Sequence, residues 1–191
     1  MSVHLPTIGV VGVSGVGKSS TVSALFGASP TALTVQTVPG LGEDFRRDPG
    51  LLREYAARLP LCDVILWVQD ARARGLALDQ SYLETLRPPR DRLVFGVNQV
   101  DLIAPGDWAG GPSPEQAQHL LEVLEERKAR LPGPVVGYSA LRAYRLQELF
   151  TALAGACRPS AVAALRAAKS LRPDPADRRE RLYLRLEGVH P

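Results

Sequence analysis

The sequence predicts a three-layer α/β fold, in which a mostly parallel sheet of about five strands carries helices on both faces. Two observations favour this class. Short, unbroken apolar runs, such as Val-Ile-Leu-Trp-Val at 64–68, suit strands that are buried on both sides. Helix-compatible stretches alternate with these runs along the chain, as repeated β–α units do. The chain has 191 residues, 45% of them apolar and 23% charged, which is enough for one domain with a substantial core.

In the first half of the chain, apolar runs predict strands over 8–11 and 33–38. Helical patterns predict helices over 18–26 and 49–59. Pro39 and Gly40 end the second strand, because this dipeptide favours a turn. Asp48 can cap the second helix, with Pro49 at its first helical position. This half therefore contains two β–α units.

In the second half, strands are expected over 64–68, 93–97 and 135–138, and helices over 79–86, 113–131 and 146–157. The longest helix opens on Ser-Pro-Glu-Gln at 113–116, a capping-box pattern with proline in the first turn. We expect Leu120, Leu121 and Leu124 of this helix to face the core. Trp67 lies within an apolar strand and is expected in the core as well.

The composition changes after Arg158. Pro159, Pro173 and Pro175 punctuate the remainder. Four arginines make its end basic, at Arg178, Arg179, Arg181 and Arg185. We therefore expect the folded domain over residues 5–158 and a basic, proline-containing tail over 159–191. Residues 160–171 could form a short amphipathic helix, and the tail is otherwise expected to be partly disordered.

Residues 12–19 read Gly-Val-Ser-Gly-Val-Gly-Lys-Ser, a full match to the phosphate-binding P-loop pattern. The loop follows a predicted strand and precedes a predicted helix, so its N–H groups can converge on phosphate oxygens. Lys18 would reach the β- and γ-phosphates as a catalytic residue, and the Ser19 hydroxyl would take one position on Mg²⁺. The residues expected to contact the phosphates are Ser14, Gly15, Val16, Gly17, Lys18, Ser19 and Ser20.

Two further patterns follow later strands, at the sheet edge where ligands of parallel sheets bind. The first is Asn-Gln-Val-Asp at 98–101, in which Asp101 can accept hydrogen bonds from the N1–H and amino group of guanine. Adenine offers no matching pair of donors. Asn98 would brace the P-loop, and the stem of Gln99 would lie over the base. The second pattern is Ser139-Ala140-Leu141, whose backbone N–H groups could meet the guanine O6.

With these residues in place, the chain resembles the small GTPases of the Era-like branch, and within it the bacterial YfjP/YeeP-like group of predicted GTPases. The supporting stretches are residues 12–20, 39–43, 63–68, 98–101 and 138–149, so the resemblance runs from about residue 5 to residue 157. It implies a P-loop NTPase fold of the G-domain type, GTP or GDP binding and Mg²⁺-dependent hydrolysis of GTP.

The chain departs from that family on the side of the metal. The family has an aspartate two residues before the Pro-Gly pair, which orients Mg²⁺, and this chain has Thr37 there. The interval from Lys18 to Thr37 is too short for the family's first switch and usual second strand, so a G domain without that strand is expected. Thr31 or Thr34 could substitute for the lost switch threonine. Leu41 follows the Pro-Gly pair in place of a water-orienting glutamine.

Three functions stay open from the sequence. The first is a guanine nucleotide-binding protein with slow or impaired GTP hydrolysis. The second is a pseudo-GTPase interaction module that binds nucleotide without turnover. The third is a P-loop kinase, against which Asn98 and Asp101 count because they form a guanine-reading pattern.

Composition and charge narrow the setting. A net charge of +3 suits an anionic ligand but does not indicate nucleic acid. Cys62 and Cys157 lack metal-ligand spacing and suit a reducing cytoplasm. No apolar stretch approaches the length of a transmembrane segment, and no signal-peptide pattern is visible. We therefore expect a cytoplasmic protein that binds guanine nucleotide and could act through a protein partner or as a homodimer.

Overall fold

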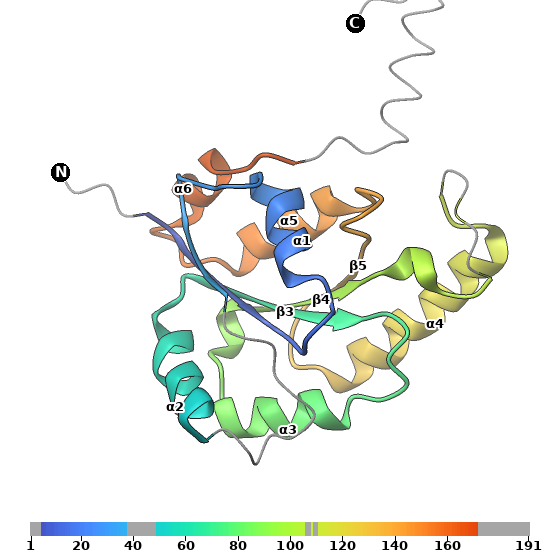
Figure 1. Ribbon diagram of the computed structural model, residues 1–191, viewed down its shortest axis with the longest axis horizontal. Helices are drawn as coiled ribbons and strands as arrows, with labels where there is room; N and C mark the ends of the chain where they lie inside the picture. Colours follow the sequence, from blue (N-terminus) through green and yellow to red (C-terminus); the bar gives the residue numbers. More distant parts are fainter. Residues whose placement is uncertain (1–4, 38–48, 106–107, 109–110, 172–191) are drawn as a thin grey trace, which may run out of the picture.

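The computed structural model describes residues 5–37, 49–105, 108 and 111–171 (Figure 1). Its centre is a five-stranded sheet in the order β2-β1-β3-β4-β5, and every pair of neighbouring strands is parallel. The strands are β1 (Thr7–Val11), β2 (Thr34–Thr37), β3 (Val64–Asp70), β4 (Leu93–Asn98) and β5 (Val135–Gly137). The expected α/β class with about five parallel strands is thus confirmed.

Helices cover both faces of the sheet (Figure 1). On one face lie α1 (Lys18–Phe26), α5 (Leu146–Ala156) and α6 (Val162–Ala167), which pack into one apolar cluster with β1 and β3. On the other face lie α2 (Pro49–Arg58), α3 (Ala77–Leu86) and α4 (Pro114–Arg130). Three short 3₁₀ turns complete the described chain: η1 (Leu59–Leu61), η2 (Arg90–Arg92) and η3 (Val100–Leu102).

The two central strands, β3 and β4, are buried along almost their whole length because helices cover them on both sides. This explains why their sequences are unbroken apolar runs and do not alternate. Trp67 in β3 is fully buried, as expected, and its Nε1 donates a hydrogen bond of 2.6 Å to Asp79 Oδ1 of α3.

The longest helix, α4, begins as its sequence predicts. Ser113 Oγ accepts a hydrogen bond from the Gln116 N–H at 3.2 Å, and Gln116 Oε1 accepts one from the Ser113 N–H at 2.8 Å. The prediction for its leucines is right for Leu120 and Leu124 and wrong for Leu121, which is 51% exposed. Residues four apart share a helix face, whereas Leu121 is turned about 100° from Leu120.

The packed part of the chain continues past Arg158. Ala161, Leu165 and Ala168 are buried in the same cluster as α1 and α5. The Ser170 N–H donates to Leu25 O at 2.9 Å, at the end of α1. The helix expected within 160–171 is therefore present as α6. The arginines of the tail and the expected cap Asp48, together with Pro39, Gly40 and Leu41, lie outside the described residues.

The order of the strands places a crevice at one edge of the sheet. From β1 the chain moves to one side, to β2, and the later strands β3, β4 and β5 extend to the other side. The connections that leave β1 and β3 therefore turn away from each other at their carboxyl ends, and ligands of open α/β sheets bind at such a point. None of the helices that the structure describes is long and apolar enough to cross a membrane.

Candidate functional site

A glycine-rich loop, residues 12–17, joins β1 to α1 at this crevice. Gly12 and Gly17 have φ angles of 148° and 88°, which only glycine adopts without strain. A Cβ on Gly12 would collide with Val68 O, and one on Gly17 would collide with Asn98 Nδ2. The loop therefore needs glycine for its backbone conformation and for its close approach to β3 and β4.

Lys18 begins α1 and folds back over the loop. Its Nζ donates hydrogen bonds of 2.8 Å to Gly12 O and 2.9 Å to Val13 O, and its partial burial lowers the pKa of the ammonium group. Ser19 and Ser20 follow in the first turn of the helix and are exposed. The ammonium group and a hydroxyl thus stand beside the N-terminus of α1, where a helix attracts anions.

The rest of the loop has an exposed part and a buried part. Ser14 and Gly15 are exposed, whereas Val16 is buried in the core. The contacts expected here from the sequence thus differ in kind. Ser14 and Gly15 can contact a ligand directly. The Val16 side chain cannot, so Val16 can contact a ligand only through its backbone.

Asn98, the last residue of β4, connects three parts of the site. Its Nδ2 donates to Val16 O at 2.8 Å, and its Oδ1 accepts from the Ala140 N–H at 3.0 Å. The bracing of the P-loop by Asn98 is therefore present. The same bond modifies one expectation: the Ala140 N–H, assigned from sequence to the guanine O6, is already engaged. A base would have to share or displace this donor.

Asp101 lies within η3, just beyond Asn98, and only 4% of it is exposed. Arg142 forms an ion pair with it, with Nε 3.9 Å from Asp101 Oδ2. Ser139 is fully buried, and its Oγ accepts a hydrogen bond of 3.0 Å from the Arg142 N–H. Leu141, between them in sequence, is 75% exposed. A buried carboxylate is thus held beside the Ser139-Ala140-Leu141 loop.

Gln99 contacts the P-loop through its amide, in a way that the sequence did not predict. Its backbone is left-handed, with φ of 63°, and its Nε2 donates to Gly15 O at 3.1 Å. Its Oε1 accepts a hydrogen bond of 3.0 Å from Arg72, which also binds Asp70 at the end of β3. Sequence reasoning missed Asp70 and Arg72. Their position directly after a buried strand was the available signal, because Asn98 has the same position.

The side of the site that would face a metal offers few possible ligands among the described residues. Among the described residues, no group of three or more His, Cys, Asp or Glu could hold a metal ion. Ser19, the residue that the sequence predicts to bind Mg²⁺, is exposed in the first turn of α1. Thr37 ends β2 opposite Val10 and is exposed. Thr34 pairs with Thr7, at the far end of the strand, so it is too remote to substitute.

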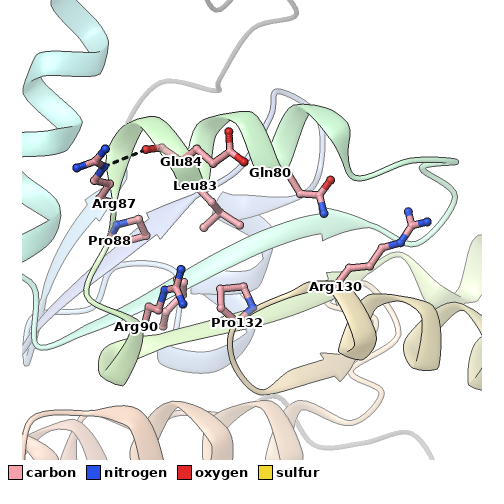
Figure 2. Close-up of a pocket in the computed structure, with 9 residues that line it drawn as sticks. Gln80, Leu83, Glu84, Arg87, Pro88, Arg90, Arg130 and Pro132 are labelled. Atoms are coloured by element: carbon pink, nitrogen blue, oxygen red, sulfur yellow. Dashed lines mark hydrogen bonds between the residues drawn. The ribbon is translucent and has the colours of Figure 1, made fainter.

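A separate hollow lies elsewhere on the molecule. It has a volume of about 890 Å³ and lies beside Leu93, the first residue of β4, so it is at the opposite edge of the sheet from the P-loop. Figure 2 shows Leu83 pointing from α3 into this hollow, with Arg87 and Arg90 at one end and Arg130 at the other. The lining residues are Gln80, Leu83, Glu84, Arg87, Pro88, Arg90, Leu93, Arg130 and Pro132.

Two of the arginines of this hollow, Arg87 and Arg130, have local partners. Arg87 Nε donates to Glu84 O at 3.4 Å, and Arg130 lies 3.2 Å from Glu126 Oε1. The carboxyl ends of α3 and α4 also meet here, and their partial negative charge offsets the positive side chains. The P-loop edge, with Lys18 and the N-terminus of α1, is therefore the better candidate site for a polyphosphate.

Comparison with solved structures identifies the fold. The chain superposes on the G domain of FeoB from Methanococcus jannaschii with a TM-score of 0.57 and 20% identity, over 79% of this chain and 96% of that one. An S. thermophilus NFeoB mutant bound to GDP gives 0.55 and 19%, over 82% and 63%. The elongation factor SelB from Methanococcus maripaludis gives 0.51 and 13%, over 90% and 35%. The fold is that of a GTPase G domain.

Two curated proteins match the sequence at higher identity. They are the uncharacterized proteins YkfA and YfjP of Escherichia coli K12, each 30% identical over 139 residues. These matches cover 60% of this chain, and the chain spans about half the length of both relatives, 48% in each case. No protein-family model matches the chain.

Proposed function

We propose that this protein binds guanine nucleotides as a small GTPase of the Era-like branch, related to the YfjP group, with slow or impaired GTP hydrolysis. The observation that carries the proposal is the buried carboxylate of Asp101, joined through the Asn98 strand end to the P-loop. A P-loop alone would fit many nucleotides. A buried carboxylate at the other end of the same crevice selects for a base with two adjacent donors.

The energetics favour guanine at this position. Asp101 would accept hydrogen bonds from guanine N1–H and the 2-amino group, and each charge-assisted bond contributes about 1.5–3 kcal/mol. Adenine would present no matching pair of donors to the buried carboxylate. The carboxylate would then lose its hydration without gaining hydrogen bonds in exchange, which is unfavourable. The GDP-bound state of one structural neighbour supports the same ligand class.

The phosphates would bind at the P-loop and the start of α1. The residues that we assign to phosphate contact are Ser14, Gly15, Val16 through its backbone, Gly17, Lys18, Ser19 and Ser20, and those assigned to the base are Asn98, Gln99, Asp101, Ser139, Ala140 and Leu141. Lys18 would exchange its bonds to Gly12 O and Val13 O in part for phosphate oxygens. Mg²⁺, held by Ser19 and the phosphates, would neutralise charge that develops during phosphoryl transfer.

Slow hydrolysis follows from the metal side of the site. Turnover requires a metal, a lysine and an oriented water to be aligned together, and poor alignment costs factors of about 10² or more. Thr37 stands where a carboxylate would orient the metal's water shell, and its short neutral side chain provides no such charge. This same observation favours the second candidate, a pseudo-GTPase module that binds nucleotide and acts through a protein partner or a second copy. A P-loop kinase is the weaker alternative.

We also infer a cytoplasmic setting, from the two buried cysteines that remain unpaired and from the nucleotide as ligand. The buried surroundings of Cys62 raise the pKa of its thiol to about 11, so it is a packing residue and not a reactive group.

A titration of nucleotide-free protein tests the proposal. The ligands are ribose-labelled GDP, a non-hydrolysable GTP analogue and ATP, each with Mg²⁺ and with EDTA. We expect both guanine nucleotides to bind and ATP to bind at least 10³-fold more weakly, on the order of the discrimination that specific hydrogen bonds allow. Equal binding of ATP and GDP would contradict the assignment of Asp101. Equal affinities for GDP and the GTP analogue, unchanged by EDTA, would favour the pseudo-GTPase module over the slow enzyme.

A further inference from the structure

Arg72 occupies the loop after β3, and this loop borders the crevice together with the P-loop. The strand order reverses between β1 and β3, so the loops that follow these two strands flank the same opening. Asp70 is the last residue of β3, and Arg72 follows two residues later. Nothing in the guanine-reading or phosphate-binding patterns includes either residue.

The guanidinium of Arg72 is held in a fixed plane. Its Nε donates to Asp70 Oδ1 at 3.1 Å and its Nη2 to Asp70 Oδ2 at 2.8 Å, the bidentate arrangement that fits a carboxylate. The backbone N–H of Arg72 also donates to Asp70 Oδ1, at 2.8 Å. Burial alone would raise the pKa of Asp70, but these bonds and the charge of Arg72 outweigh it and lower the pKa. Asp70 therefore stays ionised and keeps its hold near neutral pH.

The fixed guanidinium lies between the two ends of the proposed nucleotide site. Its Nη2 donates to Gln99 Oε1 at 3.0 Å, and Gln99 Nε2 donates onward to Gly15 O at 3.1 Å. In the other direction, the negative charge of Asp101 adds to the effect of the Asp70 hydrogen bond and charge, which chiefly raise the pKa of Arg72. A nucleotide with its phosphates on the P-loop and its base on Asp101 must pass the Gln99–Arg72 pair.

Arg72 also has a free face for such a ligand. Its side chain is 53% exposed although its Nε and Nη2 donate to Asp70 and Gln99. A guanidinium is planar, weakly hydrated and well suited to pack flat on an aromatic ring, whereas a lysine ammonium is a compact, strongly hydrated charge. An ordinary surface ion pair consists of two side chains alone. The Asp70–Arg72 pair has a third partner, Gln99, which connects it to the loop that faces the proposed nucleotide site.

We propose that Arg72 is a base-binding residue, whose guanidinium plane packs against the ring face of the bound guanine while Asp101 reads its edge. The proposal rests on the proposed function, because it takes guanine nucleotide as the ligand. The proposal assigns two different contacts with the base to two residues. Asp101 selects guanine among bases, and Arg72 adds affinity for any purine ring that is placed there.

The test compares Arg72→Gln with the unchanged protein. Glutamine keeps a flat polar group but removes the charge and the guanidinium plane. We expect the affinity for labelled GDP to fall about 3- to 30-fold, the range of a cation–π contact at a partly exposed to desolvated site. IDP, whose base lacks the 2-amino group, should weaken by the same factor, because Arg72 acts on the ring face. Pyrophosphate, measured by competition with labelled GDP, should bind as before.

Three companion variants make the result specific. Asp70→Asn should weaken GDP in the same direction, and combining it with Arg72→Gln should add little, since both act through one guanidinium. Arg72→Lys should recover only part of the loss, because lysine cannot reproduce the bidentate plane. Arg74→Gln is the matched control: Arg74 is exposed, carries the same charge and lies in the same loop. It should bind GDP as the unchanged protein does.

Two results would overturn the assignment. Affinity for GDP within twofold of the unchanged protein would show that Arg72 makes no base contact. An equal loss for pyrophosphate would show that it acts through the P-loop instead. If Arg72→Gln lowers the melting temperature, Arg72→Lys is used in its place. The ratio of its affinities for GDP and pyrophosphate then distinguishes a base contact from an effect on the P-loop. Failure of the unchanged protein to bind any guanine nucleotide would refute the proposed function itself, and Arg72 as a base-binding residue with it.

Discussion

The base side and the metal side of the crevice are built to very different degrees. On the base side, Asn98 and Asp101 come from the end of β4 and the turn that follows it, and Arg72 comes from the loop after β3. Asn98 binds the P-loop directly, and Arg72 is linked to it through Gln99. On the metal side, the described part of the chain offers the exposed Ser19 and Thr37. Under the proposed function, the protein itself would organise recognition of the base, whereas the nucleotide would supply most of the coordination of a bound metal.

This difference has a physical consequence for affinity and for rate. Buried, hydrogen-bonded groups are already oriented before a ligand arrives, so little energy is lost in arranging them. A metal held by one hydroxyl and by phosphates has more freedom, which tight binding tolerates and catalysis does not. The comparison therefore favours retained binding with weak turnover, and changes on the two sides should have separable effects.

The largest effect is expected from Asp101→Asn on the base side. An amide offers the wrong group to at least one guanine donor, so GDP affinity should fall about 10²- to 10⁴-fold, the value of two charge-assisted bonds. Xanthine carries a carbonyl in place of the 2-amino group and can accept from the new amide. XDP should therefore bind the variant more tightly than GDP, in the same competition assay.

Asp91→Asn is the matched control for this change. Asp91 is 80% exposed in its side chain and lies near Arg92 on the opposite edge of the sheet, so its loss should leave GDP binding unchanged. A variant at Asp101 that still prefers GDP over XDP would mean that the base is read elsewhere, and the base side would lose its main residue.

A smaller effect is expected from Gly17→Ala, which disturbs the close contact between the P-loop and Asn98 of β4. The new Cβ would collide with Asn98 Nδ2, at a φ that alanine adopts only with strain. We expect the free energy of unfolding to fall by about 1–3 kcal/mol. GDP affinity should fall by at least tenfold as the Asn98 bonds to Val16 O and Ala140 N–H are disturbed.

Denaturant unfolding and GDP titration measure the two consequences, with Gly155→Ala as the control. Gly155 lies in α5, is exposed and has open space where a Cβ would be added. Alanine there should raise the free energy of unfolding by about 0.5–1 kcal/mol, since glycine is the weaker helix former. If Gly17→Ala proved as harmless, the close contact between the P-loop and β4 would not matter to the site.

The smallest effect is expected from Thr37→Asp on the metal side. The change restores a carboxylate at the end of β2, where it can act on the water shell of Mg²⁺. We expect Mg²⁺ to strengthen binding of the GTP analogue several-fold over GDP, in titrations with and without EDTA. Thr34→Asp, at the opposite end of the same strand, should leave this ratio unchanged. Equal behaviour of the two variants would contradict the placement of the metal.

Much of the fold follows from the sequence because its signals are local. The apolar runs of β3 and β4, the P-loop between β1 and α1, and the Ser113 capping box each depend on neighbouring residues, and all are present. Leu121 was predicted to face inward and does not, since three nearby leucines cannot all share one face of a helix.

The contacts across loops could not be predicted in the same way. The Asp70–Arg72–Gln99 chain joins residues 27 positions apart, and no spacing rule connects them before the strand order is known. The Ala140 N–H is likewise engaged by Asn98 from 42 positions away. Motifs indicate which side chains can read a ligand, whereas tertiary structure decides which donors remain available to it.

Trp108 gives the molecule an optical property of its own. Its ring meets Tyr144 edge-on, with centroids 4.8 Å apart and planes at 89°. The backbone of Tyr144 exchanges two hydrogen bonds with Ser139, in the loop beside Asp101. Indole emission depends on the polarity and packing around the ring, so a rearrangement of that loop alters the spectrum directly. Trp108 is thus an intrinsic fluorophore next to the loop that we propose to contact the base, and its emission wavelength and intensity offer a way to follow the binding of unlabelled ligands.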